Sequence, residues 1–189
     1  MRMIGLAGRP GCGKSAVARE LASRPGVETI DLDPLAWQTY HPGTATHKQL
    51  VRRFGREILS RDGWIDRAKL ARVSLVDVAA QTDLASIVHP AVIDHLDHMR
   101  CDVQARGVEI LLVEGALLAS SEYVDRTLFD AIIWMEASDA TRRRRLQRDG
   151  RETHGDRMEH VHRDGATDVV DAEGTVREVA ERVWHVIQS

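Results

Sequence analysis

The chain has 189 residues, of which 29% are charged, and its formal net charge at neutral pH is only −3. This length is enough for one well-buried core, and the near-balance of charge argues against a general nucleic-acid binder. The two cysteines, Cys12 and Cys101, fit neither a disulfide framework nor a metal-binding spacing. No apolar run approaches the roughly 18 residues of a membrane span. We therefore expect a single cytoplasmic domain over residues 1–189 that acts on small molecules, with no nucleic-acid, membrane or protein partner.

A strand predicted over residues 3–7 leads into residues 8–15, G-R-P-G-C-G-K-S, which fit the phosphate-loop pattern G-x-x-x-x-G-K-[ST] between a strand and a helix. Glycines let such a loop turn its backbone N–H groups inward, and the helix adds the positive end of its dipole. We expect Lys14 to reach the phosphates of ATP and Ser15 to ligate Mg²⁺. The predicted nucleotide-binding residues are Gly11, Cys12, Gly13, Lys14, Ser15 and Ala16.

A second strand, predicted over residues 27–30, delivers Asp31 and Asp33 at its C-terminal end. Doubly wound parallel sheets bind their ligands at this edge. Since side chains alternate along a strand, we expect both carboxylates on one side, facing the phosphate loop and suited to proton acceptance and Mg²⁺ chemistry. The alternative is that one of the aspartates only caps the next helix.

Residues 34–106 form a mostly helical excursion before the third strand. At about seventy residues it is far longer than an ordinary crossover, and such insertions in α/β enzymes commonly hold the second substrate. Including the end of the second strand, this part of the chain carries four short motifs. They are D-x-D at 31–33, F-G-R-E-I-L at 54–59, D-G-W-I-D-R-A-K-L at 62–70 and I-V-H-P at 87–90.

These four motifs, in this order after a phosphate loop, resemble the dephospho-coenzyme A kinase family. The resemblance implies transfer of the γ-phosphoryl group of ATP to the ribose 3′-hydroxyl of dephospho-coenzyme A, with Asp33 at the position of the catalytic base. An alcohol kinase needs an aligned hydroxyl, a carboxylate that accepts its proton and cations over the phosphates, so Asp33, Lys14 and Mg²⁺ suit the reaction. Lys14 therefore joins Asp33 among the candidate catalytic residues.

Three further residues in this region are candidates for acceptor binding: Asp31, Arg67 and His89. Arg67 and His89 suit the phosphate groups of the acceptor. Purely structural roles remain alternatives for both residues, because Arg67 can pair with a neighbouring aspartate and His89 can mark the end of a helix. We expect Phe54 to lie in the core rather than at a ligand.

A third buried strand is predicted over residues 109–113 and ends in Glu114-Gly115. Apolar residues followed by an acid are typical of a strand whose carboxylate orients Mg²⁺ or its water, so Glu114 is a candidate substrate-site residue, with a structural acid as the alternative. Dephospho-coenzyme A kinases usually carry P-L-L-F-E near this point, whereas a strand ending in E-G is similar to uridine-kinase-type enzymes. A nucleoside or other small-metabolite kinase, or a non-catalytic nucleotide-binding relative, remains an alternative.

A fourth strand, predicted over residues 129–135, precedes a helix that is capped by Ser138 or Asp139 and is rich in arginine. Arg144 and Arg148 lie one turn apart on one helical face. We expect these two to neutralise charge at the transferring phosphoryl group, as catalytic residues, with a solvated basic face as the alternative. The neighbouring Arg142 and Arg143 are expected to be solvated.

Residues 149–165 have no apolar period and are expected to form a mobile lid over ATP, in which Arg157 binds the nucleotide. Both this segment and the predicted strand 168–170 depart from the family patterns R-I-x-x-Q and V-I-x-N, which leaves the adenine contacts open. A capping box, Thr175-x-x-Glu178, opens the last helix. Together the elements predict a three-layer α/β/α P-loop kinase fold with a five-stranded parallel sheet.

Overall fold

The computed structural model describes residues 1–151 and 161–189. The chain divides into two compact units. The sheet unit comprises Met1–Asp31, Cys101–Glu122 and Arg126–Ser189, and the helical unit comprises Leu32–Arg100 and Tyr123–Asp125. The helical unit covers nearly the same residues as the excursion expected over 34–106.

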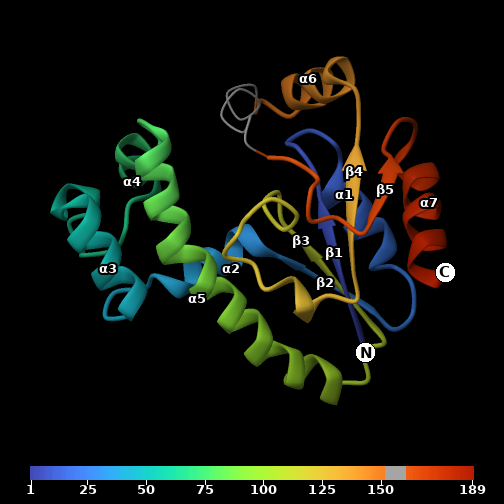
Figure 1. The fold of residues 1–189 in the computed structure, drawn as a ribbon, viewed down its shortest axis with the longest axis horizontal. Helices are drawn as coiled ribbons and strands as arrows, with labels where there is room; N and C mark the ends of the chain where they lie inside the picture. The colour runs from blue at the N-terminus through green and yellow to red at the C-terminus, as the bar shows by residue number, and fades with distance from the viewer. Residues whose placement is uncertain (152–160) are drawn as a thin grey trace. The chain divides into compact units, whose positions relative to one another are not determined.

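The sheet unit is built on five parallel strands in the order β2-β3-β1-β4-β5 (Figure 1). The strands are β1 Arg2–Ala7, β2 Val27–Asp31, β3 Ile110–Glu114, β4 Ala131–Glu136 and β5 Asp168–Asp171. This confirms the predicted α/β fold with a five-stranded parallel sheet, and each strand begins and ends within two residues of its predicted position.

Helices α1 (Lys14–Leu21) and α7 (Val176–Gln188) pack together on one face of the sheet. Side chains from both helices and from the strands form a single buried cluster there. The other face of β1 carries Gly5, where an added methyl group would lie within 3.4 Å of Leu118 and Phe129 side-chain carbons. Helix α7 begins at the predicted capping box, in which Thr175 and Glu178 bond each other's backbone N–H groups.

The helical unit contains α2 (Leu32–Thr39), α3 (Ala45–Phe54), the short 3-10 helix η1 (Arg56–Ile58), α4 (Arg67–Ser74) and α5 (Val78–Ala105) up to Arg100. Thr44 caps α3 and Asp66 caps α4, each through a side-chain oxygen that accepts from backbone N–H groups. Phe54 is buried, as predicted. No helix in the described part of the chain is both long and apolar enough to cross a membrane.

One alternative is excluded and one expectation is wrong. His89 does not mark the end of a helix, because it and Pro90 lie inside α5. Asp33 does not continue the side-chain alternation of β2, because the chain turns into α2 at Leu32 and places Asp33 in the first helical turn. Proline is tolerated in a first turn, where its missing N–H would lack a helical partner anyway, so Pro34 favours this early start.

Candidate active site

The phosphate loop joins β1 to α1 in a conformation that requires glycine. Gly11 has φ +83°, and a Cβ atom built there would lie 2.7 Å from the carbonyl oxygen of Arg142 in α6 (Asp139–Arg148). Gly13, with φ +102°, is the N-cap of α1 and has no side chain to bond the first-turn N–H groups. The loop therefore offers backbone donors at a helix N-terminus, which is a favourable environment for a phosphate group.

The Lys14 ammonium is held against the loop by backbone oxygens. Its Nζ donates to the carbonyl oxygen of Gly8 at 2.7 Å and lies 3.4 Å from that of Arg9. The charge expected to meet ATP phosphates therefore lies at the loop itself.

Ser15 and Glu114, predicted from separate motifs, are in direct contact. The Ser15 hydroxyl donates to Glu114 Oε2 at 2.6 Å, and Glu114 is only 9% exposed. Glu114 ends β3 beside Leu6 of β1 and Asp31 of β2, so the three strands bring these groups to the carboxyl edge of the sheet. A hydroxyl and a carboxylate are hard oxygen donors of the kind that Mg²⁺ prefers.

The described residues contain no metal site built from protein side chains alone. No group of three or more His, Cys, Asp and Glu side chains suited to a metal ion occurs in residues 1–151 and 161–189. The Ser15–Glu114 pair fits Mg²⁺ nevertheless, because this ion usually takes one or two protein ligands and completes its shell with water and substrate phosphates.

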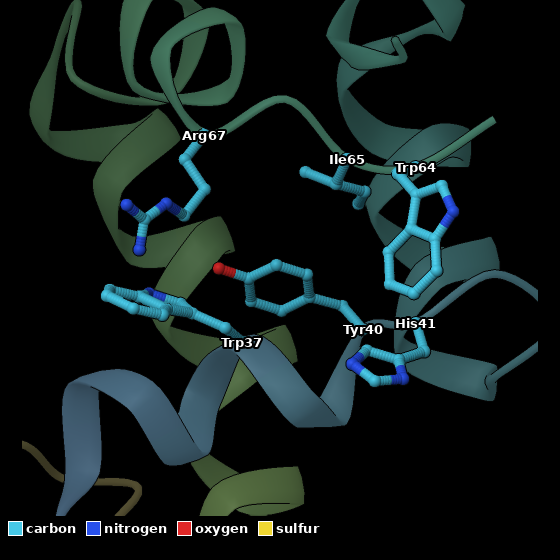
Figure 2. A pocket seen from close by; sticks show the side chains of 6 residues that line it. All are labelled: Trp37, Tyr40, His41, Trp64, Ile65 and Arg67. Atoms are coloured by element: carbon cyan, nitrogen blue, oxygen red, sulfur yellow. The ribbon is translucent and has the colours of Figure 1, made fainter. Parts of the chain in front are cut away.

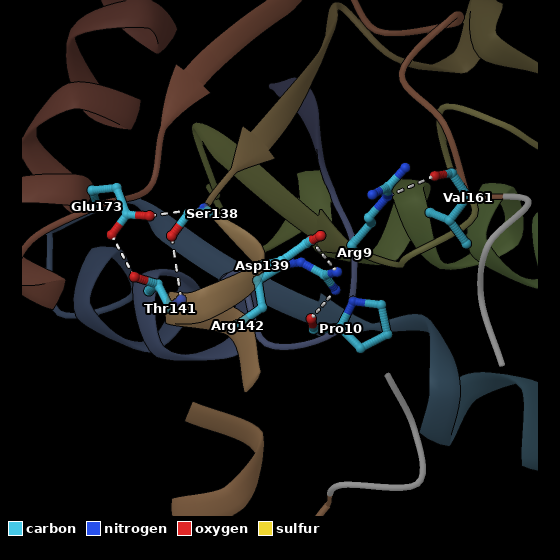
Figure 3. A network of polar contacts seen from close by, with 8 residues as sticks. All are labelled: Arg9, Pro10, Ser138, Asp139, Thr141, Arg142, Val161 and Glu173. Atoms are coloured by element: carbon cyan, nitrogen blue, oxygen red, sulfur yellow. Dashed lines mark hydrogen bonds and ion pairs between the residues drawn. The ribbon is translucent and has the colours of Figure 1, made fainter. Parts of the chain in front are cut away.

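The arginines of α6 divide between those that contact the phosphate loop and those that do not. Arg142 is not solvated, contrary to expectation, because its side chain is only 12% exposed. Figure 3 shows its guanidinium between the Pro10 carbonyl oxygen, at 3.0 Å, and Asp139, at 2.8 Å. Arg143 is exposed, as predicted.

The two predicted catalytic arginines point elsewhere. Arg148 has a 77% exposed side chain and pairs with Asp149 at 3.2 Å. Arg144 is exposed too, and its guanidinium donates to the Thr141 hydroxyl at 3.4 Å. Neither arginine contacts the phosphate loop in this arrangement, so their role in transfer remains a prediction.

Arg145 is a residue that the sequence reasoning missed. Its guanidinium donates to the Cys12 carbonyl oxygen at 2.9 Å and to the Ala172 carbonyl oxygen at 3.0 Å, which ties the phosphate loop to the segment after β5. The buried Leu146 of the same helix is no signal for Arg145, because the residues that share its helical face are Arg143 and Arg142, three and four positions away.

Glu173 fixes the other end of α6. Its carboxylate accepts from the backbone N–H of Ser138 and from the Thr141 hydroxyl, each at 2.8 Å (Figure 3). These hydrogen bonds, the backbone one foremost, lower the pKa of Glu173 to about 2. Ser138 is the N-cap of α6, as one of the two predicted alternatives. The helix that carries the loop-binding arginines is thus anchored at its start.

Arg67, predicted to bind the acceptor, lines a pocket of about 420 Å³ in the helical unit (Figure 2). The other lining residues are Trp37, Tyr40, His41, Trp64 and Ile65. The Arg67 guanidinium carbon lies 3.4 Å from the centroid of the Trp37 ring. Burial raises the pKa of the Tyr40 hydroxyl to about 12, so this group stays protonated at neutral pH.

His89 lies within α5, with its ring 6.4 Å from that of Tyr123. Burial lowers its pKa from 6.5 to about 4. At neutral pH the imidazole is therefore uncharged, and any contact with an acceptor would be a hydrogen bond rather than an ion pair.

Comparison with known proteins identifies the family. Residues 2–171 match the family described as dephospho-CoA kinase. The chain belongs to the dephospho-CoA kinase family. A dephospho-CoA kinase of Geobacter sulfurreducens is 35% identical over 150 residues, which cover 79% of this chain and 75% of that protein. The family confirms the resemblance predicted from the ordered motifs, and a kinase of this family uses ATP.

Solved structures agree with the fold. A Thermus thermophilus protein is 28% identical, with a TM-score of 0.74, and the match covers 99% of this chain and 96% of that one. A dephospho-CoA kinase from Campylobacter jejuni, at 19% identity and a TM-score of 0.57, shares the fold over 99% of this chain and 96% of its own. In the present chain, one predicted site residue, Arg157, and most of the expected lid lie outside the described residues, in 152–160.

Proposed function

We propose that the chain transfers the γ-phosphoryl group of ATP to the ribose 3′-hydroxyl of dephospho-coenzyme A, the last step of coenzyme A synthesis in the cytoplasm. The observation that carries this proposal is the contact between Ser15 of the phosphate loop and Glu114 at the end of β3, in a chain of this family. That contact supports a phosphate-and-cation site at the sheet edge, where α/β folds bind ligands.

On the nucleotide side, the residues from Gly11 to Ala16 would bind the phosphates through backbone N–H groups. Lys14 would exchange its hydrogen bond to the neutral Gly8 carbonyl oxygen for one to an anionic phosphate oxygen. A hydrogen bond between two charged groups is the stronger of the two. Arg145 would keep the loop in shape from α6. Arg144, Arg148 and Arg157 are proposed to bring positive charge to the transferring group when the lid closes.

Ser15 and Glu114 are the residues that would hold Mg²⁺, either directly or through its water shell. The ion, when bound, neutralises charge on the phosphate oxygens. The Ser15 hydroxyl now donates to the Glu114 carboxylate. A bound cation would take an electron pair from each of these two oxygens, directly or through its water, so the same pair serves the loop with and without nucleotide.

On the acceptor side, Asp33 would accept the proton of the ribose hydroxyl. The bond from the 3′-oxygen to phosphorus forms as the bond from phosphorus to the leaving oxygen of ADP breaks, and the hydroxyl proton passes to the Asp33 carboxylate. Arg67 is proposed to bind the acceptor's phosphate groups, and Asp31 and neutral His89 to contribute hydrogen bonds.

An acceptor panel tests this function. ADP release is measured with MgATP and either dephospho-coenzyme A, uridine or no acceptor. We expect release that depends on dephospho-coenzyme A and is at background with the other two. Release with uridine would instead favour the nucleoside kinase suggested by Glu114-Gly115, and ATP binding without release on any acceptor would favour a non-catalytic relative.

A further inference from the structure

The pocket of the helical unit has a composition that points to a flat, aromatic ligand. Two of its indoles are unusually exposed for tryptophan, Trp37 at 42% and Trp64 at 50%. The ring of His41 meets Trp64 edge-on, with centroids 4.9 Å apart. Exposed indoles that converge on one cavity offer stacking surface, and stacking on such surfaces is how proteins bind nucleobases without reading a base sequence.

Arg67 gives the same pocket an anion-binding edge. Its guanidinium carbon lies 3.4 Å from the centroid of the Trp37 ring, and Figure 2 shows the Tyr40 hydroxyl pointing toward the space between these two side chains. Stacking uses the face of a guanidinium and leaves its N–H groups in the plane, where they donate to phosphate oxygens. One end of the cavity therefore suits phosphate and the rest suits a ring.

The position of Trp37 relative to Asp33 indicates which aromatic ring the pocket binds. Both residues belong to α2, four positions apart, so they lie on one helical face. Four residues of helix rise about 6 Å. That separation is of the size of an adenosine, from its base to its ribose 3′-oxygen. A purine held at Trp37 would thus bring its own 3′-hydroxyl to the Asp33 carboxylate.

We propose that the pocket lined by Trp37, Tyr40, Trp64 and Arg67 binds the adenine-nucleotide half of the acceptor, with the adenine against the indoles and its phosphates at Arg67. This rests on the proposed function and adds to it the residues that select the acceptor. The pantetheine arm, a flexible amide chain without an aromatic ring, has no use for two exposed indoles. Trp37 is a specificity-determining residue in this account, and Asp33 remains the base.

The sheet unit offers a matched control for this pocket. There the Arg24 guanidinium lies over the ring of Trp184, 4.4 Å from its centroid. This is the same pair of residue types, with Trp184 on α7, and neither residue lines the helical-unit pocket. Trp184→Ala therefore removes an indole and a cation–π contact without touching the proposed adenine site.

Binding is tested first, by the tryptophan fluorescence of the full chain with its phosphate loop saturated by a non-hydrolysable ATP analogue. The added probes are dephospho-coenzyme A, adenosine 5′-monophosphate and 4′-phosphopantetheine. We expect the two adenine compounds to quench and phosphopantetheine not to. Trp37→Ala should weaken adenine-compound binding about 5- to 100-fold, while Trp37→Phe keeps most of it and Trp184→Ala all of it. Equal binding by phosphopantetheine, or unchanged binding in Trp37→Ala, would overturn the proposal.

Turnover is tested second and separates this proposal from the function on which it rests. If the wild-type chain phosphorylates dephospho-coenzyme A, Trp37→Ala should raise the acceptor KM by the same factor and leave the ATP KM unchanged. An unchanged acceptor KM would overturn the adenine site but leave the function intact. If the wild-type chain binds adenine compounds through Trp37 but transfers nothing, the function fails and the site stands. Since Trp37 is exposed, its replacement is not expected to unfold the protein, which thermal unfolding checks.

Discussion

The sheet unit and the helical unit present their functional groups in opposite ways. In the sheet unit, one continuous loop supplies the phosphate-binding backbone, and its supporting polar side chains are mostly shielded, such as Arg142 at 12% exposure and Glu114 at 9%. In the helical unit, two distant stretches, 37–41 and 64–67, form an open pocket with exposed indoles. A site for phosphate is made by backbone geometry, whereas a site for a particular acceptor is made by side chains.

We expect the two units to divide acceptor binding and nucleotide binding between them. A change in the helical unit should alter acceptor chemistry and leave nucleotide binding intact, and a change in the sheet unit should do the reverse. Substitutions that disturb both sides would show that the two units do not divide the work in this way. Substitutions at Asp33 and Arg145 test this division, and substitutions at His89 and Thr175 test the stability of the helical unit and of the sheet unit.

Replacing the proposed base should have the largest effect. Asp33→Asn keeps the size and the helical turn but cannot accept the hydroxyl proton, so we expect kcat to fall about 100- to 10,000-fold. The dissociation constant of ATP, measured by calorimetry, should not change. Asp62→Asn, another exposed aspartate of the helical unit, is the matched control and should keep its activity. Near-normal turnover of Asp33→Asn would remove the assigned base.

Removing Arg145, which supports the phosphate loop, should weaken nucleotide binding rather than acceptor binding. Arg145→Ala breaks the hydrogen bonds to the Cys12 and Ala172 carbonyl oxygens, so we expect the ATP KM to rise about tenfold with little change in the acceptor KM. Arg145→Lys should recover only part, because an ammonium cannot span both oxygens as a guanidinium does. The exposed neighbour Arg143→Ala is the control. Equal effects at 143 and 145 would mean that only the charge of the helix counts.

The neutral histidine predicts a pH dependence of stability. Because burial lowers the pKa of His89 from 6.5 to about 4, the unfolded chain binds a proton that the folded chain rejects between these values. The stability of the helical unit should therefore be full above pH 6.5 and fall by roughly 1–3 kcal/mol as the pH drops to 4. Urea unfolding followed by circular dichroism measures this. His89→Gln should flatten the profile, while His98→Gln, exposed on the same helix, should not. Parallel profiles for both variants would contradict the assignment.

The smallest effect is expected at the capping box of α7. Thr175→Ala removes the side chain that accepts from the Glu178 backbone N–H, which should cost about 1 kcal/mol of stability. Both KM values should stay the same, because the hydrogen bonds of the Thr175 side chain go to Glu178 and not to the phosphate loop. A shift in the ATP KM would show that α7 transmits to the phosphate loop.

The sequence predicted the sheet edge well for a physical reason. Asp31 and Glu114 each follow a predicted strand, and parallel strands end at one edge, so the place of both carboxylates at that edge was implied before the fold was known; their pairing in register was not. The phosphate loop was equally plain, because its glycines serve a backbone conformation that a local pattern encodes.

The sequence predicted the arginines and the pocket less well, since both depend on packing. A run of four arginines has no internal period, so pattern alone did not separate Arg145, which turns to the loop, from Arg144, which does not. Trp37 and Trp64 are 27 positions apart, and only the arrangement of the intervening elements brings both to one cavity. The alternation of the second strand was carried on to Asp33, whereas the chain turns into α2 at Leu32, directly after β2 ends.

The identity of the product tests the central claim most directly. The full chain is incubated with MgATP and dephospho-coenzyme A, and the product is examined by mass spectrometry and phosphorus NMR. We expect dephospho-coenzyme A to gain one phosphate, present as a monoester on the ribose 3′-oxygen, with one ADP formed for each product molecule. Phosphate at another position, or ADP formed without any phosphorylated acceptor, would contradict it.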